Sequence, residues 1–561
     1  MVLRSTLAVT IVLAAALGVQ TLRAEQAPTT ETPSTVTPKA SAPAKAADEA
    51  TSRKDEAAPS KETAPRPATP EADALRKAVS TLPSGKPEAE RNEHAAISSF
   101  YAARDYAPFW MSPAGSPSPK ALLVAAEIGR AGEWGLDPND FPLPNTSEPG
   151  TGATPSPSPE AIAADEIKFS LAVLKYARYA RGGRIQDPSG QLSSNLDRTP
   201  EFIKPETVLE GIAAADQPDA YLRGLNPAQP QFERLRQKYL TLLKQSKQRT
   251  AEAKRLLANM EEWRWMPAGM GAFYIWNNIP DFTQRVVKDG KIIREVRIVA
   301  GEVDKQTPIF SKPLRKIVLK PTWTVPDSVK VHELLPDMLN GGQMMREYAL
   351  QVYTKDGQLI NWRRVDWSSE DITDFEVVQP YNSMSVMGKV KFSFPNKHIV
   401  YMHDFLQQDK WMFSKKRRTY SHGCMRVANP IGLAELVLRE DKGWDSKRVV
   451  ELLNTSPPNH EIDLDRNIPV HMTYFTALVD DDGKLHTFPD VYGHERRITL
   501  ALEGKWRQIN KGRDQPPSAE TYTDRRWARR YAGDDSDSPP EWGDRPLYPS
   551  RPGFFSSLFG E

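Results

Sequence analysis

Cysteine is almost absent from this 561-residue chain, which has one thiol, at position 424. A single cysteine excludes an intramolecular disulfide, and it excludes metal sites built from paired thiols. The charge is unbiased, with 74 basic and 72 acidic residues, so we expect no nucleic-acid partner. No apolar run reaches the ~20 residues that a membrane-spanning helix needs.

Other common site motifs are missing too. The nine histidines are scattered without a His-Glu-x-x-His pattern, and no glycine-rich phosphate-binding loop is present. We therefore predict neither a metal site nor another cofactor.

The first 24 residues have the features of an export signal. Arg4 precedes an apolar stretch, Leu7–Val19, and Leu22-Arg23-Ala24 offers a cleavage site after Ala24. An uncleaved anchor is the alternative, and in both cases the rest of the chain leaves the cytoplasm. A lone cysteine is often just a small buried apolar residue, but an unpaired thiol outside the cytoplasm is exposed to oxidation.

The chain is long enough for at least two domains, and its character changes along it. Residues 25–72 are rich in Ala, Pro, Thr, Glu and Lys, which predicts a disordered tether. Helical periodicity in 73–250 predicts a scaffold domain, and short β-rich segments in 251–509 predict a catalytic domain. Residues 510–561 are predicted to be a disordered tail. The predicted fold is α+β and multidomain, with a helical N-terminal scaffold and a mostly β catalytic domain.

The secondary-structure predictions rest on particular segments. Helices are predicted at Ala121–Ala131, at Ile167–Ala180 and along the apolar stripe from Phe232 to Leu243. Strands are predicted at Ala272–Ile279, Ile293–Ala300, Leu314–Leu319, Tyr348–Tyr353, Val390–Phe394, His398–Met402 and Val470–Val479.

The residues that carry chemistry are His403 and, 21 positions later, Cys424. A free thiol titrates near ~8.5, so a cysteine nucleophile needs a neighbour that removes its proton or stabilises the thiolate. Histidine is suited to this role near neutral pH. His422, two positions before the cysteine, would have to fold back across a tight turn, whereas His403 ends a predicted strand. We therefore predict that His403 is the base and that His422 lines the site.

The residues around the cysteine predict a constrained turn. Gly423 can adopt a positive φ, and the N–H groups of Gly423 and Cys424 are candidates for an oxyanion hole, with Ser421 lining the site. Asn429 and Pro430 have the pattern of a helix N-cap and first residue. The cysteine is therefore predicted on a strand–turn–helix connection.

The pattern of His403 followed by Ser421-His422-Gly423-Cys424 resembles the active-site signature of the YkuD-type L,D-transpeptidases. Flanking segments are similar to the larger YcbB-like branch, and the likeness extends over about residues 75–505. These segments are Asn259-Met260-Glu261-Glu262-Trp263-Arg264-Trp265, Trp323-Thr324-Val325-Pro326, Gly388-Lys389-Val390-Lys391-Phe392, Pro395-Asn396 and Tyr474-Phe475-Thr476-Ala477.

The resemblance implies a periplasmic thiol acyltransferase that acts on peptidoglycan. Cys424 would attack the carbonyl between the third stem residue, a diamino acid, and D-Ala of a donor tetrapeptide. The side-chain amine of an acceptor stem peptide would then resolve the thioester into a 3→3 cross-link, with His403 moving the proton. Acylation of this cysteine by carbapenems is a further implied property.

Several segments depart from the family pattern. Only a few residues separate the helix that runs to Ser246 from the one that starts near Ala251, which leaves no room for the branch's usual peptidoglycan-binding module. Wall affinity would then be weaker or supplied by a partner, such as an inner-membrane or cell-wall synthesis protein. Residues 326–379 lie where the branch inserts a capping subdomain, which would act as a lid or as scaffold.

Three further features remain open at this point. Tyr401 is predicted to line the pocket, and Arg426 to contact a substrate carboxylate or to form a structural ion pair. The basic run Lys415–Arg418 is either a solvated loop or an attractor for stem-peptide carboxylates. The acceptor, the oligomeric state and the regulation cannot be read from the sequence.

Two alternatives to a transpeptidase are also open. An L,D-carboxypeptidase or a cysteine peptidase on the same polymer would use water as the acceptor, although papain-like peptidases usually place Cys before His. A non-catalytic cell-wall scaffold would have no need of the lone thiol.

Overall fold

The computed structural model describes residues 69–83, 87–144, 157–245 and 250–512. The predicted signal peptide, most of the predicted tether and nearly all of the predicted tail lie outside these residues. The first helix begins at Pro70, inside the last residues of the predicted tether. Within the described residues, no helix is both long and apolar enough to cross a membrane.

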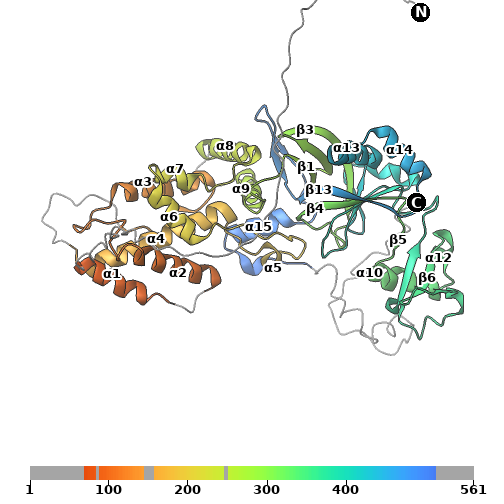
Figure 1. Cartoon of the computed structure of the whole chain (residues 1–561), viewed down its shortest axis with the longest axis horizontal. Helices are drawn as coiled ribbons and strands as arrows, with labels where there is room; N and C mark the ends of the chain where they lie inside the picture. Colours follow the sequence, from red (N-terminus) through yellow and green to blue (C-terminus); the bar gives the residue numbers. More distant parts are fainter. Residues whose placement is uncertain (1–68, 84–86, 145–156, 246–249, 513–561) are drawn as a thin grey trace, which may run out of the picture. The chain divides into compact units, whose positions relative to one another are not determined.

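The described part of the N-terminal half is helical, as predicted (Figure 1). Several of its helices begin at a proline that follows a serine or threonine. The side chains of Thr69, Ser118 and Ser158 each accept a hydrogen bond from a first-turn N–H, and proline occupies the next position, where no N–H is needed. The helices are α1 Pro70–Ser80, α2 Glu88–Ala102, α3 Pro119–Gly129, α4 Pro159–Gly182, α5 Pro188–Gln191, α6 Pro205–Ala214, α7 Pro218–Arg223, α8 Pro230–Gln245 and α9 Ala251–Arg264.

A buried carboxylate on α4 organises the core of this helical part. Glu166 accepts hydrogen bonds from the backbone N–H groups of Trp110 and Met111 and from the hydroxyl of Tyr101. Burial raises the pKa of Glu166, while these donors act in the opposite direction. The helices therefore pack around a satisfied polar group as well as an apolar core.

The catalytic half is built on one large sheet. Its strand order is β11-β3-β12-β10-β9-β4-β13-β1-β2, and β2 also pairs with β3, so eight of the strands close on themselves. The strands are β1 Phe273–Asn278, β2 Thr283–Lys288, β3 Lys291–Gly301, β4 Ser311–Leu319, β9 Val390–Ser393, β10 Met402–His403, β11 Thr419–Ser421, β12 Met425–Val427 and β13 His460–Thr473.

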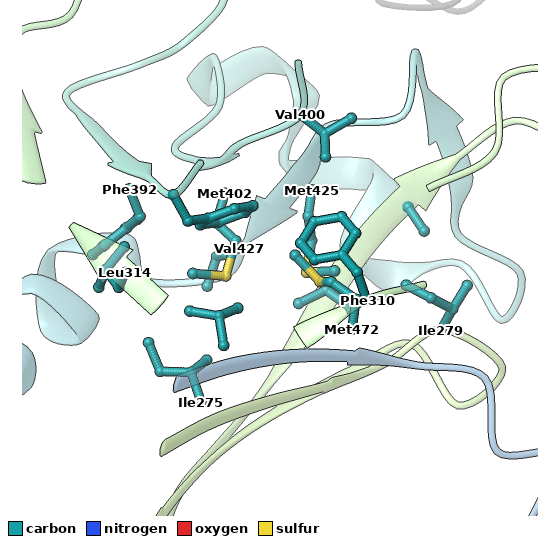
Figure 2. Close-up of a cluster of buried hydrophobic side chains, with 14 of the residues drawn as sticks. Ile275, Ile279, Phe310, Leu314, Phe392, Val400, Met402, Met425, Val427 and Met472 are labelled. Carbon is teal, nitrogen blue, oxygen red and sulfur yellow. The ribbon is translucent and has the colours of Figure 1, made fainter. Parts of the chain in front are cut away.

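The enclosed face of this sheet forms the main apolar core (Figure 2). Side chains that alternate along the strands fill it, and helix α13, Pro430–Lys442, adds Leu433, Ala434 and Val437. Asn429 caps α13 through a hydrogen bond to the N–H of Gly432, with Pro430 as the first helical residue, which confirms that prediction.

The strand predictions are correct for most segments and wrong at three. The predicted strand His398–Met402 is reduced to Met402–His403, because Ile399 has a φ of 55° and Asn396 bonds the N–H groups of His398 and Val400 in a turn. The predicted Val470–Val479 strand is broken, because β13 ends at Thr473 and β14, Ala477–Val479, pairs with β15, Leu485–Thr487. In the predicted Tyr348–Tyr353, only β6, Gln351–Thr354, is extended, since Ala349 has a φ of 50°.

Residues 323–379 form a small unit with its own sheet, ordered β5-β8-β6-β7, and its own apolar cluster. That cluster also includes Val299 of β3 and Met412 and Phe413, so the insertion packs on the outer face of the catalytic sheet. Its elements are β5 Trp323–Thr324, α10 Asp327–Val329, the π-helix Lys330–Leu334, α11 Leu335–Leu339, α12 Gln343–Glu347, β6, β7 Leu359–Ile360 and β8 Phe375–Gln379.

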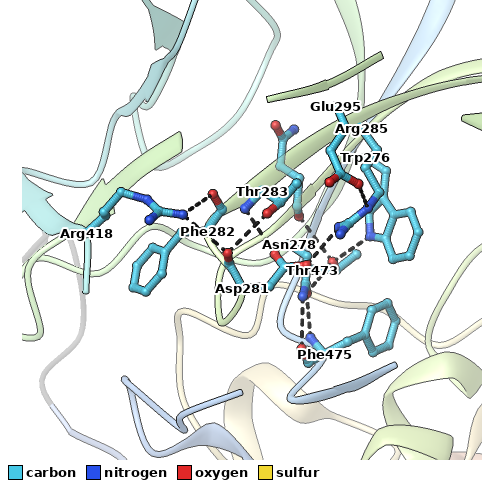
Figure 3. A network of polar contacts seen from close by, with 11 residues as sticks. Trp276, Asn278, Asp281, Phe282, Thr283, Arg285, Glu295, Arg418, Thr473 and Phe475 are labelled. Carbon is cyan, nitrogen blue, oxygen red and sulfur yellow. Dashed lines mark hydrogen bonds and ion pairs between the residues drawn. The ribbon is translucent and has the colours of Figure 1, made fainter. Parts of the chain in front are cut away.

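A polar network ties the ends of several strands together (Figure 3). Asn278 at the end of β1 bonds Thr473 at the end of β13 and the N–H and carbonyl of Phe475. Arg418 donates to the carbonyls of Ile298 and Phe282 and lies over the Phe282 ring. The side chain of Arg418 is therefore buried and has a structural role. It is not part of a solvated basic loop.

Candidate active site

Three adjacent strands place the candidate residues on one face of the sheet. Met402 of β10 lies opposite Phe392 of β9 and Met425 of β12, and all three side chains point into the enclosed core (Figure 2). Successive side chains of a strand point to opposite faces. The next register positions must therefore carry the outward-facing groups.

Those positions bring together Lys391, His403 and Arg426. His403 lies opposite Lys391 on the antiparallel side and opposite Arg426 on the parallel side. Cys424 directly precedes Met425 and is partly packed against the enclosed core, and Tyr401 directly precedes Met402 and packs against the apolar cluster of the insertion.

The register also brings Cys424 near His403. The N–H of Met425 donates to the carbonyl of Tyr401 at 2.8 Å, which continues the pairing and sets Cys424 beside Tyr401. Cys424 and His403 are then diagonal neighbours, offset by two residues across this parallel pair. Cys424 is half-buried at the rim of the core.

The hydrogen bond of His403 fixes its tautomer. Nδ1 lies 2.5 Å from the carbonyl oxygen of Asp404, and because a carbonyl can only accept, Nδ1 carries the proton. The other nitrogen, Nε2, is then an acceptor for a thiol proton. Burial, with the positive charges of Arg426 and Lys391, lowers the pKa of His403 to about 3, so the ring is neutral at pH 7.

The thiol is also neutral at rest. Burial raises the pKa of Cys424, and a backbone hydrogen bond at Tyr401 together with the positive charges of Arg426 and Lys391 acts in the opposite direction. The pair is therefore thiol and imidazole, and a thiolate–imidazolium ion pair is not its resting state. Charge would have to develop during the reaction, when His403 takes the proton.

This resting state predicts a specific pH dependence. The rate constant for alkylation of Cys424 by iodoacetamide should rise with pH to beyond 9, because only deprotonation of a thiol with a raised pKa supplies thiolate. It should show no step near ~6.5, the usual histidine pKa, because His403 has a pKa of about 3. A plateau that begins below pH 7 would contradict the neutral pair.

The loop that carries the cysteine is fixed through its carbonyl groups. Ser421 Oγ donates to the carbonyl of Cys424, and Thr307 Oγ1 donates to the carbonyl of Gly423 at 2.8 Å. Gly423 has a φ of 102°, which favours glycine, and an added Cβ would lie 3.4 Å from the carbonyl oxygen of Gln306. The connection is strand–turn–strand, not the predicted strand–turn–helix, because β12 intervenes before α13.

His422 is engaged by the insertion. Its Nε2 lies 2.6 Å from Oε1 of Glu333, on the π-helix 330–334, and 2.5 Å from Nζ of Lys305. Lys305 and Glu333 also form an ion pair at 3.3 Å. His422 therefore connects the loop that carries Cys424 to the insertion.

Arg426 is paired inside the protein. Its side chain is 2% exposed, lies 3.7 Å from the carboxylate of Asp409 and donates to the sulfur of Met412 at 2.9 Å. Burial raises the pKa of Asp409 to about 6, against the attraction of Arg426. Of the two roles predicted for Arg426, this geometry favours the structural ion pair.

Sequence reasoning assigned no role to Lys391, Glu333 or Asp409. Lys391 belongs to a quoted family segment, and its alternation with Val390 and Phe392 could have placed it on the outer face. Glu333 and Asp409 carry no local signal, because each acts on a partner distant in the sequence, His422 or Arg426.

Among the described residues, no group of three or more His, Cys, Asp or Glu side chains is placed to hold a metal ion. The arrangement instead offers one thiol, one neutral imidazole with a free lone pair and a rigid turn. These are the components of acyl transfer through a covalent cysteine intermediate.

Comparison with known proteins assigns the two halves. Residues 95–238 match the family model described as the scaffold domain, and residues 272–450 match the model of the L,D-transpeptidase catalytic domain, YkuD. The chain therefore contains a YkuD-type L,D-transpeptidase catalytic domain preceded by a scaffold domain. The predicted α+β multidomain class is confirmed.

One curated relative extends over both halves. A protein of Haemophilus influenzae named "Putative L,D-transpeptidase" is 25% identical over 420 residues, which are 74% of this chain and 81% of the relative. Two solved structures are similar over 36% of this chain with TM-scores of 0.17. One is the Ldtfm-avibactam carbamoyl enzyme, 15% identical with 49% of its chain covered, and the other is the L,D-transpeptidase from Mycobacterium smegmatis, 12% identical with 58% covered. The chain thus covers only about half of these solved chains.

Proposed function

We propose that this protein forms 3→3 peptidoglycan cross-links through a thioester on Cys424, with His403 as general base and acid. The observation that carries the proposal is the register of β10 and β12, which makes the nucleophile and a correctly protonated imidazole diagonal neighbours. The match of residues 272–450 to the L,D-transpeptidase catalytic domain supplies the reaction class.

The first half-reaction cleaves the donor tetrapeptide. The Cys424 thiol gives its proton to Nε2 of His403 as sulfur bonds to the carbonyl carbon of the third stem residue. The resulting oxyanion is held by the N–H groups of Gly423 and Cys424, whose loop is rigid. The imidazolium then protonates the nitrogen of D-Ala, the C–N bond breaks, D-Ala leaves and the thioester remains.

The second half-reaction joins the acceptor. The neutral side-chain amine of a diamino acid attacks the thioester carbonyl, and His403 takes the proton that the amine loses. The new amide forms, and the proton returns to the sulfur as it leaves. The insertion packs on the outer face of the same sheet. We propose that it limits the access of water to the thioester and so favours attack by the amine over hydrolysis.

We place this activity in the periplasm, on the basis of the N-terminal signal pattern in the sequence. Helix α9 begins six residues after α8 ends, which leaves no room for a binding module between the two helices. Contact with the cell wall would then come from the scaffold or from a cell-wall synthesis partner.

Incubation of the purified protein with disaccharide-tetrapeptides tests the proposal. Release of D-Ala with a 3→3 dimer, identified by mass, is the expected result. Tripeptide monomer without dimer would favour an L,D-carboxypeptidase, and unchanged substrate would favour a non-catalytic scaffold.

A β-lactam adduct gives an independent check of the nucleophile. Meropenem should add once to the intact protein, and peptide mapping should place the adduct on Cys424, the one thiol of the chain. An adduct elsewhere, or none after prolonged incubation, would argue against an acylable thiol.

A further inference from the structure

Lys391 extends the active-site face beyond the nucleophile and the base. It lies directly opposite His403 across the β9–β10 pair, with Val318 of β4 opposite it on the other side. Its ammonium group lies 5.0 Å from the centre of the Tyr401 ring, and Tyr401 stands beside Cys424 in the continued register. Burial lowers the pKa of Lys391 and raises the pKa of Tyr401, and a thiolate at Cys424 would raise both. Lys391 therefore faces the reaction centre.

The ammonium group of Lys391 contacts the Tyr401 ring, whereas its charged neighbours are paired with acidic groups. Arg426 pairs with Asp409, and Lys305 pairs with Glu333 and His422. Among the hydrogen bonds and ion pairs of the described residues, none uses the ammonium group of Lys391.

The carboxylate that attracts Lys391 is already engaged. Glu461 attracts Lys391 electrostatically, but its carboxylate bonds Lys316 at 2.6 Å. Lys391 is half-buried, and this burial lowers its pKa. A partly desolvated cation without a carboxylate at hydrogen-bonding distance is suited to bind an anion that arrives with the substrate.

We propose that Lys391 binds the α-carboxylate of the D-Ala that leaves the donor stem peptide, and so determines which donors the site accepts. This rests on the proposed function. In a tetrapeptide donor, only the D-Ala nitrogen and α-carbon separate the scissile carbonyl from that carboxylate, so a cation close to Cys424 can reach it.

The assignment implies discrimination between stem lengths. In a pentapeptide the same position is a neutral amide, and the carboxylate lies one residue, ~3.3–3.6 Å, farther along an extended chain. The donor with the carboxylate next to the scissile bond should therefore react faster, because a charge-assisted hydrogen bond is made only with that donor.

Two donors and three proteins test this role. The donors are a tetrapeptide ending in D-Ala and the same peptide ending in D-alaninamide, compared by kcat/KM for release of the fourth residue. The natural chain should prefer the carboxylate by about 10- to 100-fold, and Lys391→Gln should lose that preference, read as the ratio of the two donors so that any change in thiol reactivity common to both cancels. Lys312→Gln is the matched control, because Lys312 is exposed on β4 outside the stretch that pairs with β9.

A second readout uses only the thiol. Iodoacetate and iodoacetamide alkylate the same sulfur and differ in charge, so the ratio of their rates reports on a nearby cation. Lys391→Gln should lower the iodoacetate-to-iodoacetamide ratio about 10-fold, and Lys312→Gln should leave it unchanged. Equal use of both donors by the natural chain, or an unchanged ratio in Lys391→Gln, would overturn the assignment. Failure of the natural chain on both donors would instead overturn the proposed function, and the alkylation ratio would still decide the role of Lys391.

Discussion

Replacement of Cys424 by alanine should abolish cross-linking, with a loss of about 10⁴- to 10⁶-fold in kcat, as expected when a nucleophile is removed from a covalent mechanism. The chain has no other cysteine that could substitute for it. The fold should persist, because Cys424 is half-buried at the rim of the core and its loop is held by Ser421 and Thr307 through carbonyl groups that alanine retains.

The matched control for this variant is Cys424→Ser, which keeps a similar size and a hydroxyl. The hydroxyl is a far weaker acid than a thiol, so this variant should also be inactive although its thermal unfolding midpoint stays close to that of the natural chain. Cross-linking retained in Cys424→Ala would refute the nucleophile assignment.

Replacement of His403 by alanine should lower kcat/KM by about 10²- to 10⁴-fold, the usual contribution of a positioned general base. The loss of activity should result from the removal of Nε2, since Nδ1 is already hydrogen-bonded to the carbonyl of Asp404. His422→Ala should retain more activity, because His422 acts through Glu333 and Lys305 at the boundary with the insertion.

The two histidine variants should differ in the property that each one loses. His403→Ala should lose kcat/KM and keep its stability, whereas His422→Ala should keep more of its kcat/KM and lose stability, because it leaves Glu333 with one partner fewer. The opposite ranking of the two variants in kcat/KM would exchange their roles.

The parts of this molecule that follow from local sequence were predictable. Helix starts at Ser-Pro and Thr-Pro pairs, the Asn429 cap and the β-rich segments depend on neighbours in the chain. The hypothesis that pairs a thiol with a histidine also follows from chemistry alone, since a cysteine nucleophile needs a base. It required in addition that the strand of His403 lie beside the segment that follows Cys424, and the parallel pairing of β10 with β12 meets that requirement.

The rest of the fold and of the candidate site depends on tertiary contacts, which leave no signal in the local sequence. The turn at 396–400 is set by the Asn396 side chain and by a positive φ at Ile399, a residue type that normally favours strands. The partners of Arg426 and His422 come from Asp409 and from Glu333 of the insertion. No spacing rule connects such positions, so sequence left the role of Arg426 open.

One contact joins the insertion to the loop that carries Cys424. Glu333 lies in a single π-helical turn, a form that is frequent at functional sites, and its carboxylate touches the residue two positions before the nucleophile. The burial of Glu333 opposes ionisation, but His422 and Lys305 together lower its pKa. A charged contact of this kind links the position of the insertion to the geometry of the cysteine loop.

The most direct test of the central claim is the mass of the trapped covalent intermediate. The protein is mixed with a tetrapeptide donor without acceptor, quenched in acid and digested for peptide mapping. The account predicts that the peptide containing Cys424 gains the mass of the donor less D-Ala, and that Cys424→Ala gains nothing. A donor-derived mass on any other residue, or cross-linked product formed while Cys424 stays unmodified, would contradict it.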